Sequence, residues 1–338
     1  MKICRSMRIG NRIAKNRIVM PPLVCFNWGD DDGYATVNRR EHYEKRARGG
    51  VGTIIVEATA ISKEGRLSNT QLGLWKDSQI PQFRQITKGC HNHNTVMLLQ
   101  LVHAGMKATV PVAPSKTVFR DTKVKRLSKK EIKQIKHDFI EASKRAKIAG
   151  FDGVEIHNAH GYLLNQFTSS KINMRIDKYG RLLKGRIKLT LEIIKEIKEE
   201  IPDFIISVRF GVNDKTFSED ISFIKELENI GVDLLNVSSG FVDEIKVPEE
   251  YDHSWISYLG VEIKKHIQIP VVSVGGIKTH DQAKDLLNRV DFVAVGRGLL
   301  ADYEWVNKAI INTPINTCKH CKPRCRYSDD GKLCPTYK

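Results

Sequence analysis

Three side chains that can hold or move protons follow one short apolar run of the chain. His157 ends this run, and His160 and Tyr162 follow within five residues. Two imidazole N–H groups can hold a carbonyl oxygen and stabilise the negative charge that grows on it when hydride reaches the β-carbon of an enone. The phenol of Tyr162, with a reference pKa of about 10, can return a proton to the α-carbon. We therefore predict catalytic roles for these three residues, with the two histidines also binding the substrate.

Two other interpretations remain for the same residues. The histidine pair could ligate zinc, but neither an H-E-x-x-H pattern nor an obvious third carboxylate ligand accompanies it. The histidines and Tyr162 could also be ordinary packing residues.

Glycines and an arginine occur where a cofactor with a phosphate could bind. Gly275 and Gly276, and then Gly296 and Arg297, each follow a short apolar run late in the chain. Backbone amides and a guanidinium are the groups that commonly hold a phosphate where parallel strands end. We therefore predict a phosphorylated cofactor at these four residues.

Two polar residues inside apolar runs favour a flavin as that cofactor. Arg209 ends a run that is otherwise apolar, so its cation needs a polar or anionic acceptor beside it. The amide of Gln100 can donate and accept in one plane, which suits the edge of a flat heteroaromatic ring. Together with the phosphate site, these residues favour FMN. An internal ion pair for Arg209 and a core amide for Gln100 are the alternatives.

All of these residues lie at or just after short β-rich runs, and each run is followed by a longer helical pattern. Continuous apolar strands separated by helices are typical of parallel β-structure that is buried on both faces. Eight such units predict a (β/α)₈ TIM barrel, an α/β fold whose active site forms at the carboxyl ends of the strands. An open doubly wound sheet is the alternative, because it uses the same units. The predicted strands are 17–24, 52–59, 95–101, 153–157, 204–209, 232–238, 270–274 and 290–295.

The composition indicates a globular protein of one or two domains. The chain has 338 residues, of which 41% are hydrophobic and 28% charged, enough apolar side chain for a core. No run approaches the ~18 apolar residues of a membrane span, and the first residues lack the apolar stretch of a secretory signal. We therefore expect a cytoplasmic protein with no membrane partner.

The formal net charge of +16 does not by itself indicate a nucleic-acid partner. Much of the excess lies between residues 123 and 136, around a predicted helix start where Ser128 and Glu131 have the spacing of a capping box. The lysines then lie on the outer face of an amphipathic helix, and no aromatic or glycine-rich RNA-binding signature interleaves the charges. We expect no nucleic-acid partner.

Four of the seven cysteines crowd into the end of the chain. An odd total without a secretion signal argues against a disulfide framework. Thiolates so close together suit an iron–sulfur cluster or zinc, with free reduced thiols as the alternative. We divide the chain into a barrel, 1–310, and a cysteine-rich segment, 311–338, whose predicted metal ligands are Cys318, Cys321, Cys325 and Cys334.

Five motifs occur in an order known from one family: 16–22 (NRIVMPP), 57–59 (EAT), 100–105 (QLVHAG), 155–167 (EIHNAHGYLLNQF) and 237–240 (VSSG). They resemble the successive motifs of the old yellow enzyme family of FMN-dependent ene-reductases, and the resemblance covers nearly the whole chain. It implies an FMN on a (β/α)₈ barrel, reduced by NADH or NADPH and reoxidised by an activated alkene, an α,β-unsaturated carbonyl compound. Family members often pair, so we expect a homo-oligomer.

The resemblance also implies roles for single residues. His157 and His160 would bind the substrate carbonyl, Tyr162 would match the proton donor, and Phe26 would lie near the substrate. An ungapped match places Val24 where the family often has a Thr or Cys that tunes the flavin. The residues that would contact the flavin ring are Pro22, Leu23, Ala58, Gln100 and Arg209, and those that would hold its phosphate are Gly275, Gly276, Gly296 and Arg297.

The spacing of the last four cysteines resembles one branch of that family. The pattern C-x₂-C-x₃-C-x₈-C is similar to the cluster-binding segment of the 2,4-dienoyl-CoA reductase and trimethylamine dehydrogenase branch. That branch joins the barrel to a [4Fe-4S] cluster and a further nucleotide-binding domain, which we do not expect in this chain. The resemblance favours [4Fe-4S] over zinc and implies a redox partner protein.

Two other functions remain as alternatives. The chain could be an FMN-containing electron-transfer subunit, or another FMN barrel dehydrogenase of the hydroxy-acid or dihydroorotate type. The histidine pair with Tyr162 suits an alkene acceptor better than either.

Overall fold

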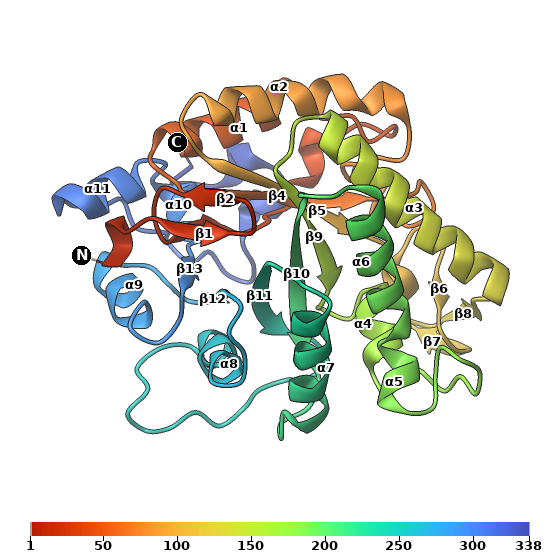
Figure 1. The fold of residues 1–338 in the computed structure, drawn as a ribbon. Helices are drawn as coiled ribbons and strands as arrows, with labels where there is room; N and C mark the ends of the chain where they lie inside the picture. The colour runs from red at the N-terminus through yellow and green to blue at the C-terminus, as the bar shows by residue number, and fades with distance from the viewer. Residues whose placement is uncertain (1, 338) are drawn as a thin grey trace.

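The structure, a computed structural model, describes residues 2–337 and is built around one closed barrel of parallel strands (Figure 1). Met1 and Lys338, the outermost residues of the two predicted units, lie outside this range. The barrel confirms the predicted (β/α)₈ fold and excludes an open doubly wound sheet. Its strands, in order around the barrel, are β3 (Ile18–Met20), β4 (Thr53–Ala60), β5 (Val96–Val102), β9 (Gly153–Asn158), β10 (Ile205–Val212), β11 (Leu234–Ser239), β12 (Val271–Val274) and β13 (Phe292–Ala294).

The strands are buried on both faces, which explains why they read as continuous apolar runs. All eight residues of β4 and all seven of β5 are buried. Alternate side chains fill the barrel interior, and the others pack against the surrounding helices. The helices are α1 (Val37–Arg48), α2 (Ile80–His91), α3 (Lys129–Ile148), α4 (Leu163–Thr168), α5 (Leu183–Arg186), α6 (Lys188–Glu200), α7 (Ser218–Asn229), α8 (Trp255–Lys264), α9 (His280–Leu286), α10 (Arg297–Ala301) and α11 (Trp305–Ile311).

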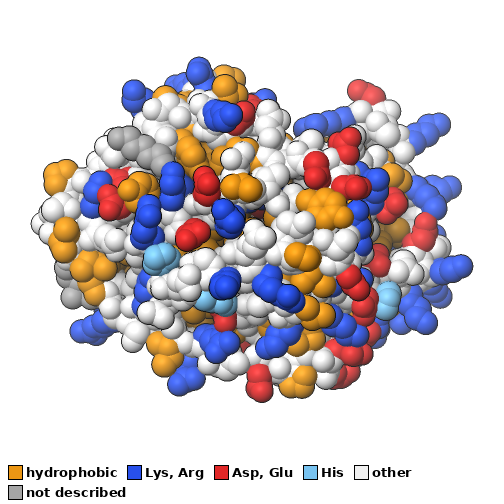
Figure 2. Space-filling model, turned by 90° about the horizontal axis from the view of Figure 1, so that it is seen from above, with side chains coloured by type: hydrophobic (Ala, Val, Ile, Leu, Met, Phe, Trp, Pro, Cys, Tyr) orange, Lys and Arg blue, Asp and Glu red, His pale blue; other side chains and the backbone are white. Residues whose placement is uncertain are grey.

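Helix α3 begins as its sequence predicts. The Glu131 backbone N–H donates to the Ser128 hydroxyl at 3.2 Å, and the Ser128 N–H donates to the Glu131 carboxylate at 2.8 Å. These reciprocal bonds satisfy donors that a helix start leaves free. Not all of the nearby charge lies on the helix, because Lys123, Lys125 and Arg126 belong to β8 (Thr122–Arg126). Figure 2 shows Lys and Arg side chains spread over one face of the molecule with Asp and Glu among them.

Two small β-elements, absent from the sequence-based expectation, flank the two ends of the barrel. A hairpin of β1 (Met7–Ile9) and β2 (Arg12–Ala14) covers the amino end, where Ile9 and Ala14 pack into the interior cluster. A sheet of β6 (Val112–Ala113), β7 (Thr117–Phe119) and β8 lies between β5 and α3. Because the hairpin covers the amino end of the barrel, a ligand-binding site is expected at the carboxyl ends of the strands.

The residues after α11 pack against the barrel through an aromatic cluster. The rings of Trp28 and Tyr327 meet edge to face with 5.5 Å between centroids. His42, on α1, hydrogen-bonds the Tyr337 hydroxyl through Nδ1 at 2.9 Å and the Tyr327 hydroxyl through Nε2 at 3.3 Å. These contacts place Tyr337, the last described residue, beside α1. Within residues 2–337, no helix is both long and apolar enough to cross a membrane.

Candidate active site

One cavity of about 190 Å³ at the carboxyl ends of the strands brings most of the predicted cofactor residues together. Gly275 and Gly276 follow β12 with φ of +123° and +70°, a backbone region that glycine enters without strain. A Cβ on Gly275 would lie 2.9 Å from the Ser254 hydroxyl, so a side chain would also crowd this turn. Seven of the nine predicted residues line the cavity: Pro22, Leu23, Arg209, Gly275, Gly276, Gly296 and Arg297.

The other two predicted cofactor residues do not line this cavity. Ala58 lies near the end of β4, and its carbonyl accepts a hydrogen bond from the Gln71 amide at 2.7 Å. Gln100 lies on β5, buried inside the barrel. Phe26 starts a short 3₁₀ helix, Phe26–Trp28, beyond β3 and is half-buried. All three nevertheless belong to strands or loops of the same barrel end.

The cavity also contains residues that the sequence analysis did not assign to the cofactor site. Lys278, Cys318 and His320 line it together with Arg297. Burial, and then the charges of Arg297 and Lys278, lower the pKa of His320. The sequence pattern around Cys318 indicated only a set of thiolate ligands. It did not indicate that this segment reaches the predicted phosphate site.

A buried carboxylate organises the interior layer just below the site. Glu155, on β9, accepts hydrogen bonds from the amide of Gln100 at 2.7 Å and the amide of Asn236 at 2.9 Å. The Ser207 hydroxyl donates to the same carboxylate at 3.1 Å. Burial raises the pKa of Glu155, and the charge of Arg209 opposes that rise. Each of these polar residues interrupts an apolar run, a pattern that suggests buried polar groups but not which of them contact one another.

Arg209 is held by that layer but keeps a free donor. Its Nη1 donates to the Asn236 side-chain carbonyl at 3.1 Å, so Asn236 connects Arg209 to Glu155. No carboxylate of residues 2–337 forms an ion pair with Arg209 within 4.0 Å, contrary to a direct internal pair. The Nε of Arg209 is buried without a partner among the described residues. A buried donor without a partner in the cavity wall suits an acceptor atom of a ligand.

The two histidines and Tyr162 form one group beside this cavity. His157 pairs in register with Arg209 of the neighbouring strand. The ring centroids of His157 and His160 are 5.0 Å apart, and those of His157 and Tyr162 are 4.8 Å apart. His160 has φ of +57° just after β9, a conformation that turns the chain back over the barrel end. The structure thus brings together the three predicted catalytic residues.

The surroundings keep both histidines neutral. Burial, then the neighbouring His160 and Arg209, hold the pKa of His157 well below its usual range. Burial, Arg209 and Lys107 lower the pKa of His160 to about 3. The His157 Nδ1 accepts the Ala159 N–H at 3.3 Å, so its own proton lies on Nε2. Each imidazole can therefore offer an N–H without carrying a charge.

Lys107 is a further part of this group that the sequence analysis missed. Its Nζ donates to the His160 backbone carbonyl at 2.7 Å and lies 5.3 Å from the centre of the Tyr162 ring. It therefore supports the backbone turn that presents His160. Burial raises the pKa of Tyr162, which keeps the phenol protonated.

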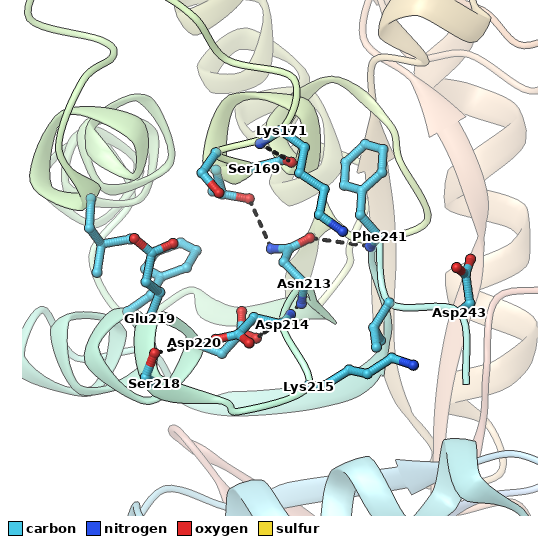
Figure 3. A pocket seen from close by; sticks show the side chains of 15 residues that line it. Ser169, Lys171, Asn213, Asp214, Lys215, Ser218, Glu219, Asp220, Phe241 and Asp243 are labelled. Carbon is cyan, nitrogen blue, oxygen red and sulfur yellow. Dashed lines mark hydrogen bonds between the residues drawn. The ribbon is translucent and has the colours of Figure 1, made fainter. Parts of the chain in front are cut away.

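A larger cavity of about 550 Å³ lies next to this group, between α4, α7 and the residues after β11 (Figure 3). Asn213 stands in its wall, accepts an amide proton of Asn165 at 2.9 Å, and so connects to the Gly161 backbone, which donates to Asn165 at 2.8 Å. Burial raises the pKa of Asp220, in the same wall, to about 7. The cavity combines acidic groups with Lys171 and Lys215, and no motif in the sequence indicated it.

The four predicted metal ligands do not converge. Cys318 lines the cofactor cavity, whereas Cys325 and Cys334 pack against the apolar cluster of Cys25, Trp28, Leu300 and Tyr327. Over residues 2–337, no three His, Cys, Asp or Glu side chains are placed to hold a metal ion, and all seven cysteines are free thiols. The metal site predicted at Cys318, Cys321, Cys325 and Cys334 is therefore not confirmed.

Comparison with known proteins identifies the family. The family model described as NADH:flavin oxidoreductase / NADH oxidase family matches residues 2–316. The chain is 39% identical to an NADH oxidase of Thermoanaerobacter brockii over 94% of this chain and 52% of that protein, so it spans about half of that relative's length. It is 38% identical to an NADPH dehydrogenase of Listeria monocytogenes serotype 4a (strain HCC23), over 88% of this chain and 91% of that one.

A solved structure agrees with this assignment. The old yellow enzyme homologue from Zymomonas mobilis superposes with a TM-score of 0.81 at 27% identity, covering 94% of this chain and 95% of that one. The barrel, the order of the motifs and the family match all point to the same group of flavin enzymes. The chain therefore belongs to the NADH:flavin oxidoreductase / NADH oxidase family, the family of the old yellow enzymes.

Proposed function

We propose that this chain is an FMN-dependent oxidoreductase that is reduced by NAD(P)H and transfers hydride to the C=C bond of an α,β-unsaturated carbonyl compound. One observation carries the proposal. A neutral pair of histidines and a protonated tyrosine stand together directly beside a cavity lined by glycines and two arginines. The family match supports flavin and nicotinamide chemistry at this barrel end.

The residues that line the cavity fit FMN. Gly275, Gly276, Gly296 and Arg297 would hold the phosphate, because they supply backbone amides and a cation where two strands end. Arg209 would direct its free Nε toward the ring, and Gln100 would offer its carbonyl oxygen, since its amide nitrogen already donates to Glu155. When bound, FMN would supply the hydride chemistry by accepting hydride from NAD(P)H and passing it to the alkene. Pro22, Leu23 and Ala58 would pack against the ring.

The histidine pair would hold the substrate carbonyl. The Nε2–H of His157 is available because its Nδ1 is already an acceptor. The His160 Nε2 lies 2.9 Å from the Ser238 hydroxyl, which can donate to it and so leave the His160 proton on Nδ1. Two donors on one carbonyl oxygen stabilise the negative charge that grows there. Phe26 would lie near the substrate, and Tyr162 would give its proton to the α-carbon.

Turnover under anaerobic conditions tests this function. The purified protein should show a bound-flavin spectrum, should be bleached by NADH or NADPH, and should then be reoxidised by 2-cyclohexenone. An electron-transfer subunit would be bleached and reoxidised by a one-electron acceptor but not by the enone. A hydroxy-acid dehydrogenase would instead be bleached by its own substrate and not by NAD(P)H.

The cysteine segment carries a separate proposal. We propose that Cys318, Cys321, Cys325 and Cys334 bind a [4Fe-4S] cluster or zinc, and that a cluster would exchange single electrons with a redox partner protein. The support is the sequence spacing alone, because the described side chains do not converge. Iron, acid-labile sulfide and zinc assays on anaerobically purified protein decide it. Stoichiometric metal that is lost in Cys318→Ser with Cys321→Ser supports the site, and metal-free wild-type protein rejects it.

A cytoplasmic location and a homo-oligomer remain predictions.

A further inference from the structure

The segment that carries the first two of the four clustered cysteines covers one side of the cofactor cavity. Cys318 and His320 line that cavity together with Gly276, Lys278 and Arg297. The latter three come from the loops after β12 and β13, whereas His320 comes from the chain beyond α11. An imidazole from a distant part of the sequence thus stands among the groups best placed for a phosphate.

The imidazole of His320 has an unused hydrogen-bonding atom. Its Nε2 is buried and has no partner among residues 2–337. A buried polar atom without a partner costs free energy, and in a ligand cavity it usually marks a contact that the ligand completes. The same cavity wall contains the cations Arg297 and Lys278, so an anion suits this position.

The backbone of His320 adopts a left-handed conformation in the turn that lines the cavity. Its φ is +49°, in the left-handed region that favours glycine over a residue with a side chain. The His320 N–H donates to the Cys318 Sγ at 3.4 Å, which fixes the turn and directs the imidazole. A side chain held at a position that favours glycine is more readily explained by a contact than by the backbone.

We propose that His320 is a phosphate-binding residue of the cofactor site and that segment 318–321 closes the cavity over the phosphate. The inference rests on the proposed FMN cofactor. A phosphate has three terminal oxygens and more acceptor positions than one guanidinium satisfies. His320 adds a donor from the C-terminal segment to those of the glycine turns and Arg297. The C-terminal segment therefore takes part in cofactor binding.

The test compares two flavins that differ only in the phosphate. Flavin is removed from the wild-type protein and from His320→Ala, and each is titrated with FMN and with riboflavin while flavin fluorescence is followed. Loss of one hydrogen bond to a charged group should weaken FMN binding about tenfold or more, and riboflavin binding should not change. His320→Gln, whose amide N–H can replace the imidazole N–H, should recover much of the FMN affinity. His137→Ala, an exposed histidine on α3, should bind both flavins like the wild type.

Each other outcome has a distinct meaning. Equal loss for FMN and riboflavin in His320→Ala, or no loss for either, overturns the phosphate role alone. If His320→Ala fails to fold, His320→Gly suits the left-handed backbone and gives the same comparison. A wild-type protein that binds neither flavin overturns the proposed function and this inference with it. The measurement needs no alkene turnover, so failure of the enone reaction leaves the inference standing.

Discussion

At the scale of single residues, burial decides what the histidine pair can do. His157 and His160 would be partly charged in water at pH 6.5, but burial and the nearby cations lower both pKa values and keep the rings neutral. A neutral imidazole gives one N–H and leaves the developing negative charge on the substrate oxygen. The lowered pKa values of the two histidines therefore match the proposed role, in which the pair binds a carbonyl and does not itself supply the proton.

Replacing both histidines tests that role through the two half-reactions. His157→Ala with His160→Ala should slow reoxidation of the flavin by an enone at least ~100-fold, because both donors to the oxygen are lost. Reoxidation by a quinone or by oxygen should change little, since it needs no carbonyl donors. Stopped-flow absorbance measures both rates on the same sample. Asn at either position keeps a donor and should retain part of the rate, whereas equal loss with every acceptor would indicate a folding role.

Tyr162 acts at the same scale but through its own proton. Burial raises its pKa above the usual value of 10, so the phenol stays protonated across neutral pH and loses its proton only at higher pH than a free tyrosine. Tyr162→Phe should slow enone reduction about 100-fold. The wild-type rate of enone reduction should stay flat with pH up to about 10 and fall above it, and reduction by NAD(P)H should be unchanged in the variant. A wild-type rate that falls well below that pH would contradict a protonated phenol as the donor.

At the scale of the elements, the strands hold the site through one shared carboxylate. Glu155 on β9 binds Gln100 of β5, Ser207 of β10 and Asn236 of β11, so four neighbouring strands meet at its two oxygens. Glu155→Gln should lower the free energy of unfolding by about 1–3 kcal/mol, because an amide cannot accept from all three donors and Arg209 loses its counter-charge. Urea unfolding measures the change. Ser207→Ala removes one donor and should cost less, and a Glu155→Gln protein as stable as the wild type would contradict the network.

Burial of whole elements decides which parts of the fold could be predicted from the sequence. The eight barrel strands were predictable because burial on both faces makes them continuous apolar runs, as in β4 and β5. The sheet of β6, β7 and β8 was not, since its strands are short and largely exposed. The roles of Glu155 and His320 were hidden for another reason. Their partners come from other elements, and only the closed barrel brings them together.

At the scale of the whole molecule, two contacts hold the C-terminal segment against the barrel. Tyr327 is buried between Trp28 and His42 at one end, and Cys318 with His320 covers the cofactor cavity at the other. Between these contacts the chain is largely exposed. The segment is thus fixed at two places and accessible between them, so its stability can differ from that of the barrel.

Removing the aromatic contact tests that arrangement. Tyr327→Ala deletes a ring that is 2% exposed, a change that costs about 3 kcal/mol for a large buried side chain. The lost stability should affect the C-terminal segment alone. Trypsin should therefore cleave after the exposed Lys319 and Arg324 at least tenfold faster, while the barrel keeps its circular dichroism and melting temperature. Tyr34→Ala, a tyrosine whose hydroxyl lies 2.9 Å from the Ser78 hydroxyl and outside the C-terminal segment, is the matched control and should be cleaved like the wild type. If Tyr327→Ala instead lowers the melting temperature of the whole protein, the segment and the barrel unfold as one unit. Unchanged cleavage would show that the aromatic cluster does not hold the segment.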